Sequence, residues 1–338
     1  MRSTLKSLAV SLPPVDQWTS HSPSDLWPHD PLRPVFPSLQ AFEFNYLYER
    51  GPLGLLFERF TEHMLKRHAY QLKHLVFPAW ITSDYFGVLV SSAIHFPNLE
   101  SITIRSSALT MTIASQMPNL KSLTFPTFEP VTPSIPPHSF PSLRRFSGSC
   151  RCFSDILTRE RPITHVQFDG AVFDMEDASI FAEGAQPTWS DVFDAIKQFP
   201  MSSGPVHHLS FYVSSINLSA LRKTLPYVRS LKSIVICLRS NPKDINKQHS
   251  AHERFSQLGT CFLSRLPHLR SFLLSDEPKY AYRGKRFSHS RDEKMQRAVL
   301  RGYEASCPGL TQVAFTGTCV WEKTAPGEWT RKRHPRLL

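Results

Sequence analysis

Glycine is scarce in this sequence, with 13 residues out of 338, whereas proline is abundant, with 28. Loops that wrap phosphate groups are rich in glycine, and neither the P-loop pattern nor the dinucleotide-binding pattern occurs here. Proline fixes the backbone and cannot continue a helix, so we expect many short segments with rigid boundaries. Nucleotide-binding loops of these two kinds are therefore excluded.

Cysteines and long apolar runs are also few. Six irregularly spaced cysteines do not make a disulfide framework in a chain of this length, which favours a reducing compartment, the cytoplasm or the nucleus. No apolar run approaches the roughly 18 residues of a membrane span. The apolar stretch near the start is soon broken by Pro13 and Pro14, so we expect neither a membrane segment nor a signal peptide.

Catalytic and metal-binding motifs are missing as well. The sequence has no Gly-x-Ser-x-Gly and no His-Glu-x-x-His pattern. Cys150 and Cys152 lack the second cysteine pair that a zinc site needs, and the adjacent His207 and His208 would face opposite sides of a strand. We predict no enzymatic activity, no metal and no cofactor. A catalytic group assembled only in space leaves no such motif, and that alternative stays open.

The positive charge is confined to two segments. The chain has 39 Lys and Arg against 28 Asp and Glu, a net charge of +11. Residues 279–301 hold eight cations against Asp292 and Glu293, and the tail adds four more at Arg331, Lys332, Arg333 and Arg336. The rest of the chain is nearly neutral, so its body is not a general polyanion binder.

One phrase recurs along the chain: an apolar residue and proline, one further residue, then leucine followed by apolar residues three and five positions later. Phe96-Pro97-Asn98-Leu99 leads in this way to Ile102 and Ile104. The full and partial copies begin their apolar pattern at Leu5, Leu39, Leu72, Leu99, Leu120, Leu143, Ile163, Val206, Leu231, Leu269 and Leu310. Several spacings match the ~20–29 residues of a leucine-rich repeat. Apolar residues two apart face the same side of a strand, so each copy predicts a strand with one buried face.

The intervals between the copies predict the other side of each coil. Amphipathic helices are expected within 53–64, 83–94, 188–199 and 292–303, and a loop in the proline-rich segment 126–137. We therefore predict an α/β fold, an irregular leucine-rich-repeat solenoid (horseshoe) with a parallel concave sheet and convex helices or loops. Residues 1–320 would form about eleven repeats, and 321–338 a strand-turn cap with a basic tail.

The repeated phrase and the end of the chain resemble a known family. The end runs from Cys307-Pro308-Gly309-Leu310 to Trp321-Glu322-Lys323-Thr324-Ala325-Pro326-Gly327-Glu328-Trp329. Over nearly its whole length the chain is similar to the F-box/leucine-rich-repeat-like proteins of mushroom-forming fungi. The resemblance implies the substrate-recognition part of a ubiquitin-ligase receptor, in which the repeats hold a target and a separate F-box docks the ligase core.

Two features depart from that family. The asparagine or cysteine usual at the ninth repeat position is missing, and no F-box precedes the first strand at Leu5. A solenoid needs a polar cap at its ends, and four residues cannot build one. We expect a truncated member of the family; the alternative is an N-terminal edge that pairs with another protein.

The concave face is the expected binding surface. Its positions are Ala41, Glu43, His74, Val76, Ser101, Thr103, Ser122, Thr124, Arg145, Ser147, His165, Gln167, His208, Ser210, Ser233, Val235, Ser271, Leu273, Gln312 and Ala314. Most are small or polar, which suits either a solvated sheet or a groove for a protein partner. We predict a groove in which Arg145, His165 and His208 contact an acidic or phosphorylated target, with Lys285 and Arg286 at the rim.

The basic segment allows a second interpretation. Tyr280, Tyr282 and Phe287 alternate with cations, as in a loop that contacts nucleic acid. A solvated insertion followed by a helix explains the same pattern, and we favour it. The tail at 331–336 is either a nuclear-import signal or a soluble terminus. The alternatives to a receptor are thus a stand-alone scaffold or a nucleic-acid-associated protein, with nucleic acid and membrane not expected as partners.

Overall fold

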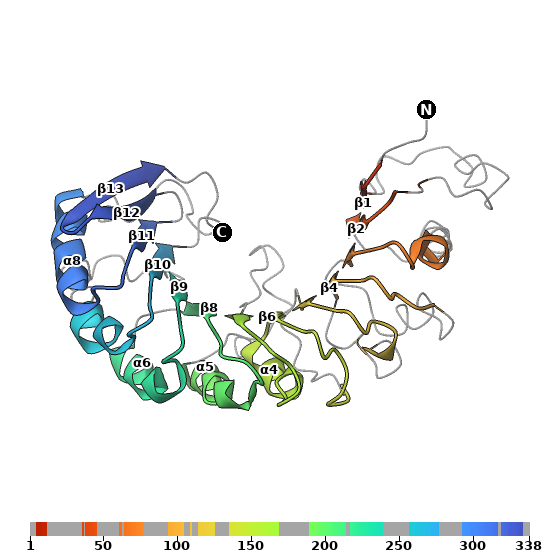
Figure 1. The fold of residues 1–338 in the computed structure, drawn as a ribbon, viewed down its shortest axis with the longest axis horizontal. Helices are drawn as coiled ribbons and strands as arrows, with labels where there is room; N and C mark the ends of the chain where they lie inside the picture. Colours follow the sequence, from red (N-terminus) through yellow and green to blue (C-terminus); the bar gives the residue numbers. More distant parts are fainter. Residues whose placement is uncertain are drawn as a thin grey trace, which may run out of the picture. The chain divides into compact units, whose positions relative to one another are not determined.

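The computed structural model describes residues 5–11, 36, 38–45, 61–62, 64–77, 94–104, 109, 114–125, 135–168, 189–213, 217–238, 257–276, 293–316 and 319–333. The chain divides into two compact units, residues 1–162 and 163–338. Both units are α/β, with a mostly parallel sheet whose strands follow one another in chain order, as in a solenoid (Figure 1). The predicted fold class is confirmed at this level.

The first unit contains six described parallel strands. They are β1 (Ser7–Ser11), β2 (Ala41–Asn45), β3 (His74–Val76), β4 (Ser101–Thr103), β5 (Ser122–Thr124) and β6 (Arg145–Gly148). Each pairs in parallel with the next, so that Phe42, Leu75, Ile102, Leu123 and Phe146 lie in one row. All five side chains are buried. This row is the predicted core, in the predicted register.

Where the proline phrase occurs, it forms the turn that leads into the strand. The amide of Leu99 donates to the carbonyl of Phe96 at 3.3 Å, and Leu120, Leu143, Leu269 and Leu310 make the same bond to the residue three positions earlier. Proline suits the second position of such a turn because its φ is already set. The recurrence of this turn explains why the strands start at equivalent places in successive coils.

Two asparagines link successive coils in place of the missing asparagine ladder. Asn98 Nδ2 donates to the carbonyl of Tyr70 at 2.6 Å, and Asn119 Nδ2 donates to the carbonyl of Pro97 at 2.7 Å. Both residues follow the proline of the phrase, so the side chain reaches back one coil from the turn. The coil-to-coil bond of a repeat protein is therefore kept, but at a different position of the repeat.

The outer side of the first unit carries α4 (Cys150–Ile156), a helix that the sequence did not predict. Ser149 caps it, with its hydroxyl accepting from the amide of Arg151 at 3.2 Å. Residues 61–62 and 64–68 are also helical, which overlaps the end of the helix expected within 53–64. The helix expected within 83–94 lies almost wholly outside the described residues.

A buried arginine holds the chain beside α4. Arg161 is fully buried and donates to the carbonyls of Ser139 at 2.8 Å, Pro136 at 2.7 Å and Ile156. Burial lowers the pKa of its guanidinium to about 10. These carbonyls belong to irregular or helix-terminal backbone that lacks strand partners, so the guanidinium replaces the missing donors.

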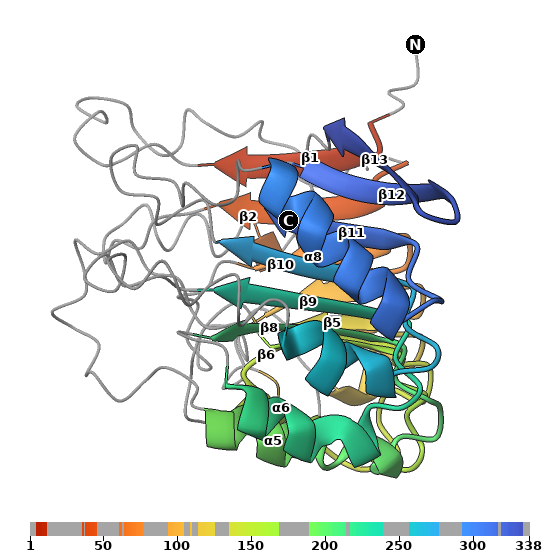
Figure 2. The ribbon, with the colours of Figure 1, turned by 90° about the vertical axis from the view of Figure 1, so that its left-hand side faces the viewer.

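The second unit continues the parallel pattern and ends with a hairpin. Its parallel strands are β7 (His165–Phe168), β8 (His208–Val213), β9 (Ser233–Leu238), β10 (Ser271–Asp276) and β11 (Gln312–Thr316). Figure 2 shows β9 and β10 side by side and pointing the same way. Then β12 (Cys319–Ala325) and β13 (Glu328–Arg333) pair antiparallel, so the expected closing strand and turn form two strands.

Helices cover one face of the sheet in the second unit (Figure 1). They are α5 (Trp189–Ile196), α6 (Leu218–Thr224) and α8 (Glu293–Ser306), with short 3-10 helices η5 (Phe199–Met201), η6 (Leu225–Tyr227) and η8 (Leu263–Arg265). The helices predicted within 188–199 and 292–303 are confirmed, whereas α6 was not predicted.

Polar contacts join α8 to the hairpin. Trp321 Nε1 donates to Gln296 Oε1 at 2.7 Å in the core, and Glu304 accepts from Lys323 Nζ and from the amide of Gly327, each at 2.8 Å. These bonds hold the pKa of the Glu304 carboxyl below its usual value, with the Lys323 hydrogen bond as the main cause. The hairpin is thus held to the rest of the unit through α8.

No helix among the described residues is long and apolar enough to cross a membrane.

Candidate functional site

In the second unit, the face of the sheet opposite the helices presents an ordered row of polar side chains. Parallel register places His165, His208, Ser233, Ser271 and Gln312 next to one another on successive strands. All five are partly exposed, while the residue that follows each of them is buried on the helix side. Neighbouring strands are ~4.8 Å apart, so the row offers hydrogen-bonding groups at a regular spacing.

The two histidines of this row are stacked. Their ring centroids lie 4.0 Å apart with an angle of 13° between the planes, and His165 Nδ1 lies 2.9 Å from Thr164 Oγ1. Further along the row, Ser271 Oγ donates to Gln312 Oε1 at 3.0 Å. The row therefore has an imidazole end that can donate, accept or carry charge, and a neutral hydroxyl and amide end.

His207 lies apart from this stack, as the alternation of strand side chains predicts. Its Nδ1 lies 3.1 Å from the carbonyl of Ser230, in the turn before β9. His207 thus helps to fix that turn, whereas its neighbour His208 lies on the open face. The adjacent pair in the sequence does not act as one ligand pair.

The second row of the same face ends in an apolar cluster. Gln167, Ser210, Val235, Leu273 and Ala314 share the register. Leu273 and Ala314 lie on the predicted face, but the prediction that they are displayed there is wrong, because both are buried together with Val320, and Val235 packs against them. Val320 is directly opposite Ala314 in the antiparallel pairing, so the C-terminal hairpin supplies the apolar neighbour.

The open face of the first unit carries mostly small side chains. Its two rows are Ala41, His74, Ser101, Ser122, Arg145 and Glu43, Val76, Thr103, Thr124, Ser147. Arg145 is exposed at β6 beside Ser122. No ion pair or hydrogen bond of the Arg145 side chain occurs within the ranges that the structure describes, so its guanidinium is available to a partner.

Two of the five predicted partner-binding residues are thus brought into contact, His165 and His208. Arg145 belongs to the other compact unit. Lys285 and Arg286 lie outside the described residues. The predicted groove therefore has one defined element, the histidine stack on β7 and β8.

The cysteines and the possible metal ligands form no disulfide and no metal cluster among the described residues. Cys150 and Cys152 are both buried in α4, and all six cysteines are free thiols. Among the described residues no group of three His, Cys, Asp or Glu side chains is placed to hold a metal ion.

Sequence reasoning missed a pocket on the helical side of the second unit. It has a volume of about 680 Å³ and is lined by Arg222, Leu225, Pro226, Arg229, Thr260, Cys261, Arg265 and Pro267. Arg222 Nη2 donates to Cys261 Sγ at 2.8 Å, although 39 residues separate them. No spacing in the sequence predicts such a meeting. Hydrogen bonds from Thr260 and Arg222 lower the pKa of the Cys261 thiol.

No protein-family model matches the chain, and no curated protein matches it in sequence.

Proposed function

We propose that the protein is a protein-interaction module whose leucine-rich-repeat-like coils bind a partner on the open sheet face. The observation that carries this proposal is the aligned row of partly exposed polar side chains on β7 to β11, opposite the face that the helices cover. A repeat sheet of this kind offers an extended surface that fits another polypeptide better than a small molecule.

The histidine stack would be the main contact on this surface. Two imidazoles in contact present a flat apolar area together with donor and acceptor atoms, a combination that can bury area and still satisfy polar groups of a partner. An acidic or phosphorylated partner would also gain charge-assisted hydrogen bonds when an imidazole is protonated. Arg145 would serve the same chemistry on the first unit.

The more specific role is that of the substrate-recognition part of an F-box-type ubiquitin-ligase receptor. It is supported by the resemblance of the proline phrase and of the closing hairpin to the fungal F-box/leucine-rich-repeat-like proteins. The six free thiols support placement in the cytoplasm or the nucleus. An in-frame F-box in the coding sequence upstream of Met1 would favour this role, and its absence would favour a stand-alone scaffold.

Proximity labelling followed by binding assays on the full chain tests the interaction role. We expect the double variant His165→Ala/His208→Ala to weaken binding of the captured partner about tenfold, as loss of a central contact does. His268→Ala is the matched control, because His268 is exposed in the turn before β10 and outside the row. If partners bind the double variant and Arg145→Ala as tightly and as fast as the parent at low salt, the open face is not the binding surface.

A further inference from the structure

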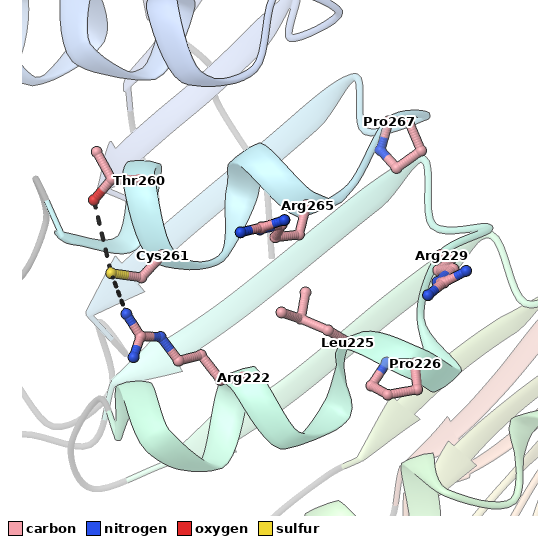
Figure 3. A pocket seen from close by; sticks show the side chains of 8 residues that line it. All are labelled: Arg222, Leu225, Pro226, Arg229, Thr260, Cys261, Arg265 and Pro267. Carbon is pink, nitrogen blue, oxygen red and sulfur yellow. Dashed lines mark hydrogen bonds between the residues drawn. The ribbon is translucent and has the colours of Figure 1, made fainter.

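The pocket on the helical side of the second unit is a groove between two walls. Helix α6 and the 3-10 helix η6 form one wall, and the segment 257–267, which includes η8, forms the other. In Figure 3 Arg222 and Cys261 lie at one end, Leu225 and Arg265 lie between the walls, and Arg229 lies at the other end with Pro226 and Pro267. The cations are therefore spread along the groove rather than gathered at one point.

The groove carries positive charge that the described residues do not neutralise. Among the described residues that line it, none is acidic. Within the part of the chain that the structure describes, Arg222 donates to a thiol, and neither Arg229 nor Arg265 forms an ion pair. Like charges along one groove repel one another, and an anionic occupant reduces that repulsion while accepting paired hydrogen bonds from the guanidinium groups.

The other residues that line the groove indicate which kind of ligand fits it. Leu225, Pro226 and Pro267 are apolar, and the two prolines have no amide hydrogen to offer. None of the described residues that line the groove is aromatic, so they offer no stacking surface of the kind on which single-stranded nucleic acid binds. An apolar floor between separated cations suits a chain in which acidic and apolar side chains alternate.

We propose that this groove binds an extended acidic segment of another protein. Its carboxylate or phosphorylated side chains would contact Arg222 and Arg265, and then Arg229, while its apolar side chains would pack on Leu225 and the prolines. This site lies on the helix-covered side of the unit and is independent of the open sheet face proposed above. It gives the chain a second binding surface, selective for negative charge.

The reactivity of the Cys261 thiol should show whether the groove is occupied. Its thiol is partly exposed in the groove, accepts from Arg222 and lies 3.7 Å from Thr260 Oγ1, and these contacts favour the thiolate. An acidic side chain that engages Arg222 would take this donor away from the sulfur. Occupancy would then shield Cys261 and reduce its thiolate fraction, and both effects slow its alkylation by iodoacetamide.

The test measures binding of a fluorescein-labelled peptide in which glutamate alternates with leucine, and of its phosphoserine analogue, to the full chain. We expect binding that weakens with salt, together with slower alkylation of Cys261 followed by peptide mass spectrometry. Arg222→Glu and Arg265→Glu should each weaken binding by about tenfold or more. Lys223→Glu, the same charge change next to Arg222 on α6, should stay within about twofold because Lys223 does not line the groove.

Several results would overturn the proposal. If the peptide bound both arginine variants as tightly as the parent, its binding site would lie elsewhere. If neither peptide slowed the alkylation of Cys261 on the parent protein, the groove would not be the binding site, and this result depends on no variant. Inorganic phosphate that protects Cys261 as well as the phosphoserine peptide would mean a simple anion site, and tighter binding of single-stranded DNA would mean a nucleic-acid site. The His165→Ala/His208→Ala protein should bind the acidic peptide normally, which separates this site from the open face.

Discussion

The two units repeat the same apolar strand pattern, but several of their strands differ in length. In the first unit β3, β4 and β5 have three residues each, whereas β8, β9 and β10 in the second have six. Proline comes directly after the last buried apolar residue beyond β3 and β5, at Pro78 and Pro126, and has no amide to donate to a neighbouring strand. The apolar pattern thus sets where a strand starts, and beyond β3 and β5 a proline in the sequence limits how far it can extend.

The outer sides of the units differ in how they satisfy the backbone. The second unit places α5, α6 and α8 over its sheet, and most carbonyls there are paired within helices. The described outer side of the first unit has more irregular backbone next to the seven-residue α4, and the side chain of Arg161 supplies donors to it. Arg161 therefore satisfies, by itself, several carbonyls of irregular backbone in the first unit.

The largest expected effect on stability comes from a substitution in the row of buried side chains on the strands of the first unit. Leu123 is fully buried between Ile102 and Phe146, so Leu123→Ala should reduce the free energy of unfolding by about 2 to 5 kcal/mol through lost transfer and a cavity. Hydrogen exchange should show the loss in β4 to β6 and spare β8 to β10. A change under about half a kcal/mol would mean that the side chain is exposed and the register is shifted by one residue.

Arg161→Met should have the next largest effect and should act only on the irregular outer side. Methionine keeps much of the volume but removes the guanidinium donor from the carbonyls of Ser139 and Ile156 and leaves Pro136 with only the amide of Ser139, which should cost about 2 to 4 kcal/mol. Chemical denaturation measures the loss. The control Arg159→Met changes an exposed arginine two residues away and should be nearly neutral. Equal effects of both variants would show that the guanidinium contacts are not stabilising.

Gly259→Ala tests how closely the helical layer of the second unit is packed. A methyl group at Gly259 would come within 2.8 Å of Tyr303 Cδ1 in α8, and this overpacking should cost about 1 to 3 kcal/mol. Gly302→Ala is the matched control, because Gly302 lies in α8 itself and a carbon added there meets nothing within 4 Å. Thermal melting should show the first variant destabilised and the second stabilised by up to about 1 kcal/mol. A stabilised Gly259→Ala protein would show that the helices can move apart freely.

The smallest expected effect concerns the attachment of the hairpin. The folded-state pKa of Glu304 lies below its unfolded value, so its contribution to stability is present above the unfolded value and is lost as pH falls through the folded value. Glu304→Gln should lower stability by about 1 kcal/mol or less at pH 7, because the Lys323 pair lies near the surface. Melting curves should show the gap between parent and variant closing below pH ~4. A gap that persists at low pH would contradict the ionic origin.

Much of the architecture was predictable because each coil repeats a local pattern. Apolar residues at alternate positions after each leucine predicted a strand at all eleven copies, and the structure has β1 to β11 at those places. The amphipathic spacing around Val192 and Val299 predicted α5 and α8. By contrast, α4 and α6 are seven residues long, too short for the 3.6-residue period to stand out from its surroundings.

The binding surfaces were less predictable because they depend on residues far apart in the chain. His165 and His208 were separate candidates in the sequence, and the parallel register of β7 and β8 is what stacks their rings. Leu273 and Ala314 are buried through the antiparallel hairpin, and Arg222 meets Cys261 only because α6 packs beside the following helical segment. The sequence by itself determined the strands, their buried sides and their order, since these depend on alternation within each repeat. The tertiary structure alone decided which polar groups meet across coils, because packing and register set those distances and neither has a local signal.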